Sequence, residues 1–128
     1  MCENNGVGLI IIVVDDCADI RLMLSIMLTL RGHRVLEAEN GQVAIELAQC
    51  NCPDLILMDL YMPVLDGFAA TRRLREIDEL SHIPIIAVSA NSNESHKADA
   101  LAAGCNEYIS KPINFEQLDH LLHSLLAA

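Results

Sequence analysis

Five polar or charged residues follow the ends of four short apolar segments, and their types could carry out phosphoryl chemistry. They are Asp15 and Asp16 after residues 9–14, Asp59 after 55–58, Ser89 after 85–88, and Lys111 shortly after 108–109. Carboxylates brought close together repel one another, so one would stay protonated unless a cation lay between them. An all-carboxylate site with few protein ligands favours Mg²⁺ over Ca²⁺.

A lysine and a hydroxyl beside such a metal suit a phosphoryl group, because cations neutralise its oxygens while a carboxylate can be the nucleophile. The chain has neither a GxxxxGK[ST] loop nor a GxGxxG turn. A bound nucleotide would therefore lack its usual phosphate cradle. A phosphoryl group carried by the protein itself is the better interpretation, and Asp59 is its natural acceptor.

The elements that must position these residues alternate along the chain. The pattern predicts strands at 9–14, 34–38, 55–58, 85–88 and 108–109, with helices over about 19–31, 41–50 and 68–80, then one that ends near 104 and one that starts after 114. Asn40 and Asn114 are the expected helix caps. Five such units predict an α/β fold, a parallel sheet covered by helices on both faces, with ligands bound at the carboxyl ends of the strands.

Length and charge limit the function further. The 128 residues, 52% of them hydrophobic, fit one domain, which we expect at 9–127 after an extension at 1–8. A net charge of −10 lacks the footprint of a nucleic-acid binder. The longest apolar run near the start, 9–14, is too short to span a bilayer, so we expect no membrane insertion and a cytoplasmic location.

Five sequence motifs occur in order along the chain: IIVVDD ending at Asp16, LILMD ending at Asp59, MPVLDG ending at Gly67, VSA around Ser89, and YISKP ending at Pro112. Together they resemble the motifs of receiver domains in two-component response regulators, especially receivers associated with hybrid sensor kinases. The resemblance covers nearly the whole chain. It implies a doubly wound (βα)5 fold of flavodoxin-like type with strand order 2-1-3-4-5.

Residue by residue, the resemblance implies that Asp59 is the phosphoacceptor and that Lys111 and Ser89 bind the phosphoryl oxygens. Asp16, Asp59 and the backbone carbonyl of Tyr61 would hold Mg²⁺, Asp15 would complete the metal site by orienting a metal-bound water, and Mn²⁺ could substitute for Mg²⁺. Tyr108 would turn inward when Ser89 moves toward the phosphate. The surface that changes would comprise the fourth helix, the fifth strand and the fifth helix. The domain would promote its own phosphorylation and dephosphorylation without turning over an external substrate.

The predicted helix 19–31 carries apolar residues on more than one side. Leu22 and Ile26, four residues apart, correspond to the outward side on which receivers of this family meet a sensor histidine kinase or a histidine phosphotransfer protein. We expect a docking patch there, although single surface leucines are common. Tyr61 and Asn91 correspond to positions that flank the path of the hydrolytic water, and the bulk of Tyr61 is expected to slow hydrolysis.

Two other functions are compatible with parts of the pattern. A small phosphatase with an aspartyl-phosphate intermediate would want a second acid two residues after the nucleophile, where this chain has Tyr61. A receiver that acts only as an interaction module, without phosphorylation, usually loses part of the acidic set, which is complete here. Each residue alone also has an ordinary explanation as a helix cap, a turn or a solvated charge.

Overall fold

The computed structural model describes residues 8–90 and 94–126 and contains five strands and five helices within them. The strands are β1 (Ile10–Val14), β2 (Arg34–Ala38), β3 (Leu55–Asp59), β4 (Ile85–Ser89) and β5 (Glu107–Ser110). The helices are α1 (Ala18–Leu30), α2 (Gly41–Asn51), α3 (Gly67–Glu76), α4 (Glu94–Ala103) and α5 (Phe115–Leu126). All strand pairs are parallel, and their order, β2-β1-β3-β4-β5, confirms the predicted doubly wound sheet.

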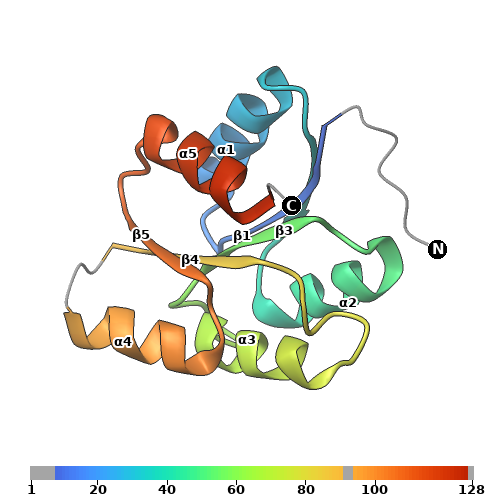
Figure 1. Ribbon diagram of the computed structural model, residues 1–128, viewed down its shortest axis with the longest axis vertical. Helices are drawn as coiled ribbons and strands as arrows, with labels where there is room; N and C mark the ends of the chain where they lie inside the picture. The colour runs from blue at the N-terminus through green and yellow to red at the C-terminus, as the bar shows by residue number, and fades with distance from the viewer. Residues whose placement is uncertain (1–7, 91–93, 127–128) are drawn as a thin grey trace.

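The sheet lies between two helical layers (Figure 1), with α1 and α5 on one face and α2, α3 and α4 on the other. Alternate residues of each central strand face opposite layers, as the period of two in a strand requires. In β1, Ile11 and Val13 pack toward α1 and α5, while Ile12 and Val14 pack toward the other helices. The central strands are buried on both sides, which explains their uninterrupted apolar sequence.

Two predicted helix caps are confirmed. Asn40 accepts a hydrogen bond from Val43 N (2.9 Å), and Asn114 accepts from Glu116 N (2.9 Å) and Gln117 N (3.1 Å). The side chain of Asp66 caps α3 in the same way through Ala69 N (2.8 Å). These short-range bonds fix where α2, α3 and α5 begin.

The prediction that the third helix reaches Leu80 is wrong. α3 ends at Glu76, and Ile77 leaves the helix with extended backbone angles. Leu80 and Ile83 are buried in the core on the α2–α4 side of the sheet, where Ile77 also packs. Apolar burial by the segment after α3 therefore outweighs continuation of the helix.

The amino edge of the sheet, where the strands begin, is held by loop side chains. Asp54 Oδ2 accepts from Ile10 N (2.8 Å), and Asn106 Oδ1 accepts from Ile85 N (2.9 Å). Arg75, near the end of α3, donates to Asn106 Oδ1 (2.8 Å) and to the backbone carbonyls of Ser81 (2.9 Å), Ile83 (2.7 Å) and Gly104 (2.9 Å). This guanidinium thus ties α3 to the segments that lead into β4 and β5.

Within the described residues, no helix combines the length and apolar character needed to cross a lipid bilayer. The predicted extension at 1–8 stays a prediction, since residues 1–7 lie outside the part of the chain that the structure describes.

Candidate functional site

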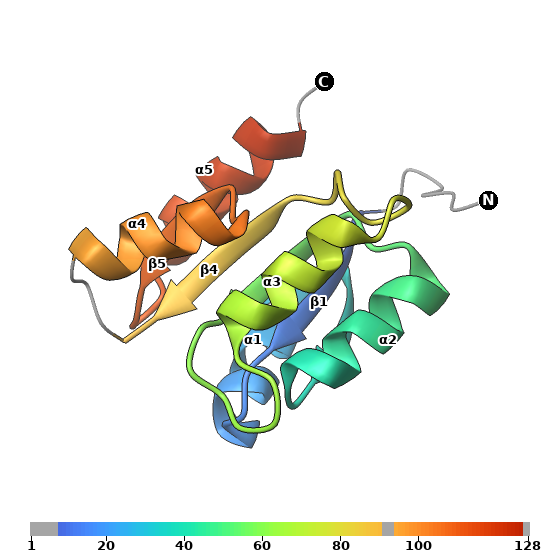
Figure 2. The ribbon, with the colours of Figure 1, turned by 90° about the horizontal axis from the view of Figure 1, so that it is seen from below.

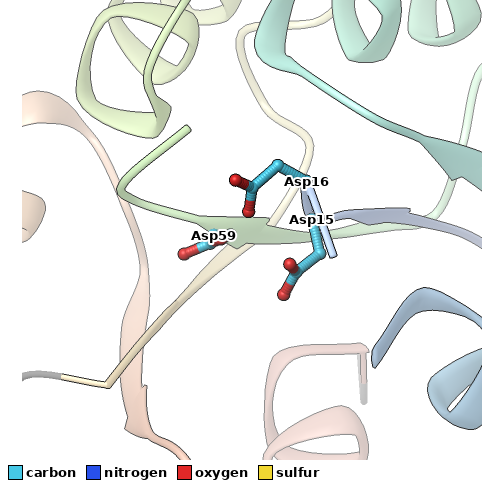
Figure 3. Close-up of side chains that lie close together, drawn as sticks. All are labelled: Asp15, Asp16 and Asp59. Atoms are coloured by element: carbon cyan, nitrogen blue, oxygen red, sulfur yellow. The ribbon is translucent and has the colours of Figure 1, made fainter. Parts of the chain in front are cut away.

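The carboxyl edge of the sheet gathers the three aspartates (Figure 3). Asp15 and Asp16 follow β1, and Asp59 is the last residue of β3, the strand paired with β1. One carboxylate oxygen from each residue lies within 4.8 Å of the other two. The predicted convergence of these residues is confirmed, and it follows from the pairing of β1 with β3.

Asp15 is buried and hydrogen bonded through both carboxylate oxygens. Its Oδ1 accepts from Cys17 N (2.9 Å), and its Oδ2 accepts from Lys111 Nζ (2.9 Å). Arg21 of α1 donates to the backbone carbonyl of Asp15 (2.6 Å) and lies 3.5 Å from Glu37 of β2. Asp15 is therefore fixed between two cations, while Asp16 is exposed to solvent beside it.

Sequence reasoning missed Arg21. A cation in the first turn of a helix is disfavoured by the helix dipole, so its position in α1 was the available signal. The unfavourable position is offset by the carboxylate of Glu37 and the backbone carbonyl of Asp15, which both contact the guanidinium.

Asp59 is buried, and its Oδ2 lies 3.6 Å from Lys111 Nζ. Burial raises the pKa of Asp59 to about 6; the charge of Asp15 raises it too, while Lys111 and the Tyr61 amide oppose the increase. Burial alone would lower the pKa of Lys111, but its hydrogen bond to Asp15 and the charges of Asp59 and Asp15 raise it above the ordinary value. Lys111 is thus a permanent cation that only partly compensates three acids.

These residues fit a divalent cation. The donors are hard carboxylate oxygens, and they come within 4.8 Å of one another. Burial and the charges of Asp15 and Asp16 raise the pKa of Asp59, so a cation beside this carboxylate would favour its ionised form. A hard ion with oxygen ligands and bound water suits this donor set. Three carboxylates and one lysine therefore leave a net negative charge at the site, which the predicted ion would neutralise.

Ser89 and Tyr108 lie on the neighbouring strands. Ser89 ends β4, is fully buried, and its backbone carbonyl accepts from Lys111 N (2.8 Å). Tyr108 lies on β5, half-buried, and packs against the core on the α2–α4 side of the sheet. Ser89 is thus held at the same edge as Lys111, and the switch roles of Ser89 and Tyr108 stay predictions.

Tyr61 lies beside the acceptor and contacts two helices. Its amide donates weakly to Asp59 Oδ1 (3.4 Å), while its ring packs edge-on against Phe68 of α3, with centroids 5.8 Å apart. The Tyr61 hydroxyl is hydrogen bonded to His96 Nδ1 of α4. Sequence reasoning assigned no histidine a role, and no local signal pairs residues 61 and 96. Metal binding by the Tyr61 carbonyl stays a prediction, and Asn91 lies outside the described residues.

Helix α1 exposes the two apolar residues singled out from the sequence. Leu22 is 55% exposed and Ile26 51%, whereas Leu24 and Leu28 are buried against the sheet. Leu22 and Ile26 line a shallow groove with Asp19, Met23 and Met27. Met23 also lines a second, apolar groove with Ile20, Pro112, Ile113 and Lys111, so the apolar surface extends to the lysine of the site.

Comparisons with known proteins agree with this arrangement. Residues 11–123 match the family described as response regulator receiver domain. Protein PilH of Pseudomonas aeruginosa is 40% identical over 117 residues, which cover 91% of this chain and 97% of that protein. Histidine kinase P4 of Formosa agariphila is 34% identical over 116 residues, covering 91% of this chain but 8% of the kinase.

A solved structure shows the same fold. It is the receiver domain of a sensor histidine kinase from Pseudomonas aeruginosa, described as having a magnesium ion coordinated in the active site cleft. Its TM-score is 0.88 at 34% identity, and the match covers 94% of this chain and 99% of that one.

The doubly wound sheet with an acidic cluster and a lysine at its carboxyl edge defines a class of α/β signalling module. The chain belongs to the response regulator receiver domain family, and its function is that of a receiver in a two-component system.

Proposed function

We propose that Asp59 accepts a phosphoryl group from a phosphohistidine of a sensor histidine kinase or a histidine phosphotransfer protein. The observation that carries the proposal is the position of Asp59, buried at the end of β3 with Lys111 Nζ 3.6 Å from its Oδ2. The transfer forms a bond between a carboxylate oxygen and phosphorus as the bond from phosphorus to the donor's imidazole nitrogen breaks.

Asp15, Asp16, Asp59 and the backbone carbonyl of Tyr61 would hold Mg²⁺, and Mn²⁺ could take its place. When bound, the ion supplies positive charge that stabilises the oxygens of the transferring phosphoryl group. Asp15 is already fixed by Cys17 N and Lys111, so Asp16, which is exposed, is the ligand that can adjust to the ion.

Lys111 and Ser89 would bind the phosphoryl oxygens once Asp59 is modified. Phosphorylation replaces one carboxylate charge by about two phosphoryl charges. One added charge at about 4 Å from Lys111 interacts by about 4 kcal/mol at an effective dielectric constant of 20. A complete two-state population shift needs about 5.5 kcal/mol, so this pair and a hydrogen bond from Ser89 could together switch the α4-β5-α5 surface through Tyr108.

The exposed side of α1 is the proposed docking site for the phosphodonor. Leu22 and Ile26 are exposed, and the apolar surface continues through Met23 to the groove that Lys111 lines. A helical partner that presents a phosphohistidine could bury the leucine and isoleucine while its phosphoryl group reaches the acidic edge. The domain would then act in the cytoplasm and modify only its own aspartate, without turnover of an external phosphomonoester.

Labelling with acetyl phosphate tests the acceptor. The wild-type chain should incorporate phosphate only when Mg²⁺ is present, and Asp59→Asn should abolish incorporation. Asp78→Asn, at an exposed acidic residue on the amino side of the sheet, is the matched control and should label normally. Labelling that persists in Asp59→Asn would assign the acceptor elsewhere, and a folded wild-type chain that neither labels nor responds to beryllofluoride with Mg²⁺ would favour the interaction-only alternative.

Leu22→Glu tests the docking side. It should slow phosphotransfer from a histidine-phosphorylated partner and leave labelling by acetyl phosphate unchanged, since the small donor needs no docking surface. Leu101→Glu, at an apolar residue of α4 that is 43% exposed, is the control for added charge. Equal loss with both donors would remove the docking proposal while leaving Asp59 as the acceptor.

A further inference from the structure

The contact between Tyr61 and His96 joins the connection after β3, which follows the acceptor, to the start of α4. Tyr61 lies two residues after Asp59, in the connection that leads into α3, and His96 lies in the first turn of α4. The rings pack edge to face with centroids 5.5 Å apart, and the phenol hydroxyl is hydrogen bonded to His96 Nδ1. Figure 2 shows the connection into α3 and the start of α4 at the end of the sheet toward which the strand arrows point.

Two other rings contact the side chain of Tyr61, although this residue is 48% exposed. Phe68 of α3 contacts one part of the ring at an interplanar angle of 75°, and His96 of α4 contacts it at 65°. An exposed tyrosine without such partners would sample several rotamers. The two edge contacts and the hydrogen bond select one orientation of the ring, in a residue whose backbone amide donates to Asp59 Oδ1 (3.4 Å).

We infer that His96 is a positioning residue that fixes the orientation of the Tyr61 ring, two residues after the acceptor, and so lengthens the lifetime of the phosphoryl group on Asp59. This inference rests on the proposed function of Asp59. In hydrolysis, a water oxygen bonds to phosphorus as the bond between phosphorus and the Asp59 oxygen breaks. Inorganic phosphate leaves, the carboxylate is regenerated, and the proton from water passes to solvent. A ring fixed at this place reduces the approach of that water.

The arrangement also couples lifetime to the position of α4. Because His96 moves with α4 while Tyr61 is anchored next to Asp59 by the backbone, a displacement of α4 must break or redirect the contact. A partner that binds α4 would then change the rate of dephosphorylation without touching the acidic residues.

The test measures decay of the aspartyl phosphate after the donor is removed. Tyr61→Phe keeps the ring but loses the hydroxyl, and His96→Leu removes its hydrogen-bond partner; each should accelerate decay about two- to tenfold, the range expected for loss of one hydrogen bond. The double variant should decay no faster than the single ones, because both remove the same interaction. His96→Asn, which can place an oxygen near the position of Nδ1, should restore part of the wild-type lifetime.

A spectroscopic measurement reports the same contact without any chemistry. The chain has two tyrosines and no tryptophan, so in Tyr108→Phe the tyrosine fluorescence comes from Tyr61 alone. His96→Leu in that background should change the Tyr61 emission, and His120→Leu, at an exposed histidine of α5, should leave it unchanged.

The outcomes separate the two proposals. If the wild type does not label on Asp59, both the acceptor assignment and this inference fail. If it labels normally but Tyr61→Phe and His96→Leu decay at the wild-type rate, or more slowly, the role of His96 is overturned and the proposed function stands. Independent, additive accelerations would also overturn it, since they exclude a shared contact.

Discussion

The two edges of the sheet balance their charged groups in opposite ways. At the amino edge, Arg75 donates to four acceptors, three of them backbone carbonyls, and Asn106 satisfies the first amide of β4. At the carboxyl edge, three carboxylates share Lys111, and the pKa of Asp59 rises to about 6. At the amino edge, the Arg75 guanidinium is bound by acceptors of the chain itself. At the carboxyl edge, the acidic cluster can still bind a cation, and Lys111 can bind a phosphoryl group.

The amino edge of the sheet contributes to stability, and the carboxyl edge carries the functional site. Satisfied polar groups at the amino edge hold the strand starts, and removing Arg75 leaves the part-buried carbonyls of Ile83 and Gly104 without this donor. At the carboxyl edge, burial of the Asp59 carboxylate, together with its repulsion by Asp15 and Asp16, opposes folding in the absence of metal. Removing a charged side chain should therefore lower the free energy of unfolding at the amino edge and raise it at the carboxyl edge of the metal-free protein.

Loss of the amino-edge guanidinium should have the largest effect. Arg75→Met keeps much of the apolar stem but leaves several acceptors unpaired, so we expect the free energy of unfolding to fall by about 2–4 kcal/mol. Urea unfolding measures this. Arg73→Met, on the same helix, loses an exposed 3.5 Å contact to Gln42 and should change stability by less than about 0.5 kcal/mol. A small loss in Arg75→Met would show that water replaces the guanidinium there.

Metal should strengthen the carboxyl edge by a comparable amount. Mg²⁺ at about a hundred times its Kd should raise the free energy of unfolding by about 2.7 kcal/mol, because it binds only the folded chain. Asp16→Asn should lose most of this gain, and chelation should reverse it in the wild type. Thermal unfolding with and without the ion provides the measurement, with Asp78→Asn as the control. An equal gain in Asp16→Asn would place the ion elsewhere.

Removing the acceptor charge should stabilise the metal-free protein. The folded pKa of Asp59 lies near 6, above its ordinary value of 3.8, so its contribution to stability is full at low pH and is lost as pH rises through about 6. Asp59→Asn should therefore gain about 1–2 kcal/mol over wild type at pH 7.5, after allowance for solvent screening.

The gain in Asp59→Asn should shrink toward pH 4, where the wild-type carboxyl is protonated. Urea unfolding in a chelating buffer at both pH values distinguishes this from a general effect of the amide. A pH-independent gain would mean that ionisation of Asp59 is not what opposes folding.

The smallest effect concerns a histidine at the amino edge. His33 Nδ1 accepts from Leu9 N (3.2 Å), and burial lowers the pKa of His33; the charge of Asp119 raises it in part, and Arg31 lowers it. Its contribution is therefore complete above about pH 6.5 and is lost as pH falls below that value. Between pH 7 and 5, wild type should lose a few tenths of a kcal/mol more than His33→Asn, which keeps an acceptor without titrating. Parallel pH profiles would contradict this.

Much of the fold follows from local sequence. Apolar strands ending in polar residues predict the sheet, and Asn40 and Asn114 mark two helix starts through hydrogen bonds that span only two or three residues. The end of α3 could not be predicted from the local sequence, because Leu80 fits the helical pattern yet is buried outside the helix. Burial against distant elements decided that boundary.

The residues of the site also fall into a group that the sequence predicts and a group that it does not. The acids and Lys111 could be predicted, since parallel topology alone carries strand ends to one edge. Arg21 is marked only by its unfavourable place near the start of α1, and His96 by no local signal, because their contacts with Asp15 and Tyr61 are not encoded by spacing. Contacts between elements far apart in sequence become visible only when the helices have been placed.

Gly67 has a consequence for redesign of the domain. A Cβ at this position would lie 2.3 Å from the carbonyl oxygen of Asp59, so the start of α3 rests directly on the strand end that carries the acceptor. An engineer who wishes to build a timer from this receiver should therefore keep position 67 constant and vary positions 61 and 96. Those two side chains offer a way to adjust how long a signal persists without moving the aspartate that records it.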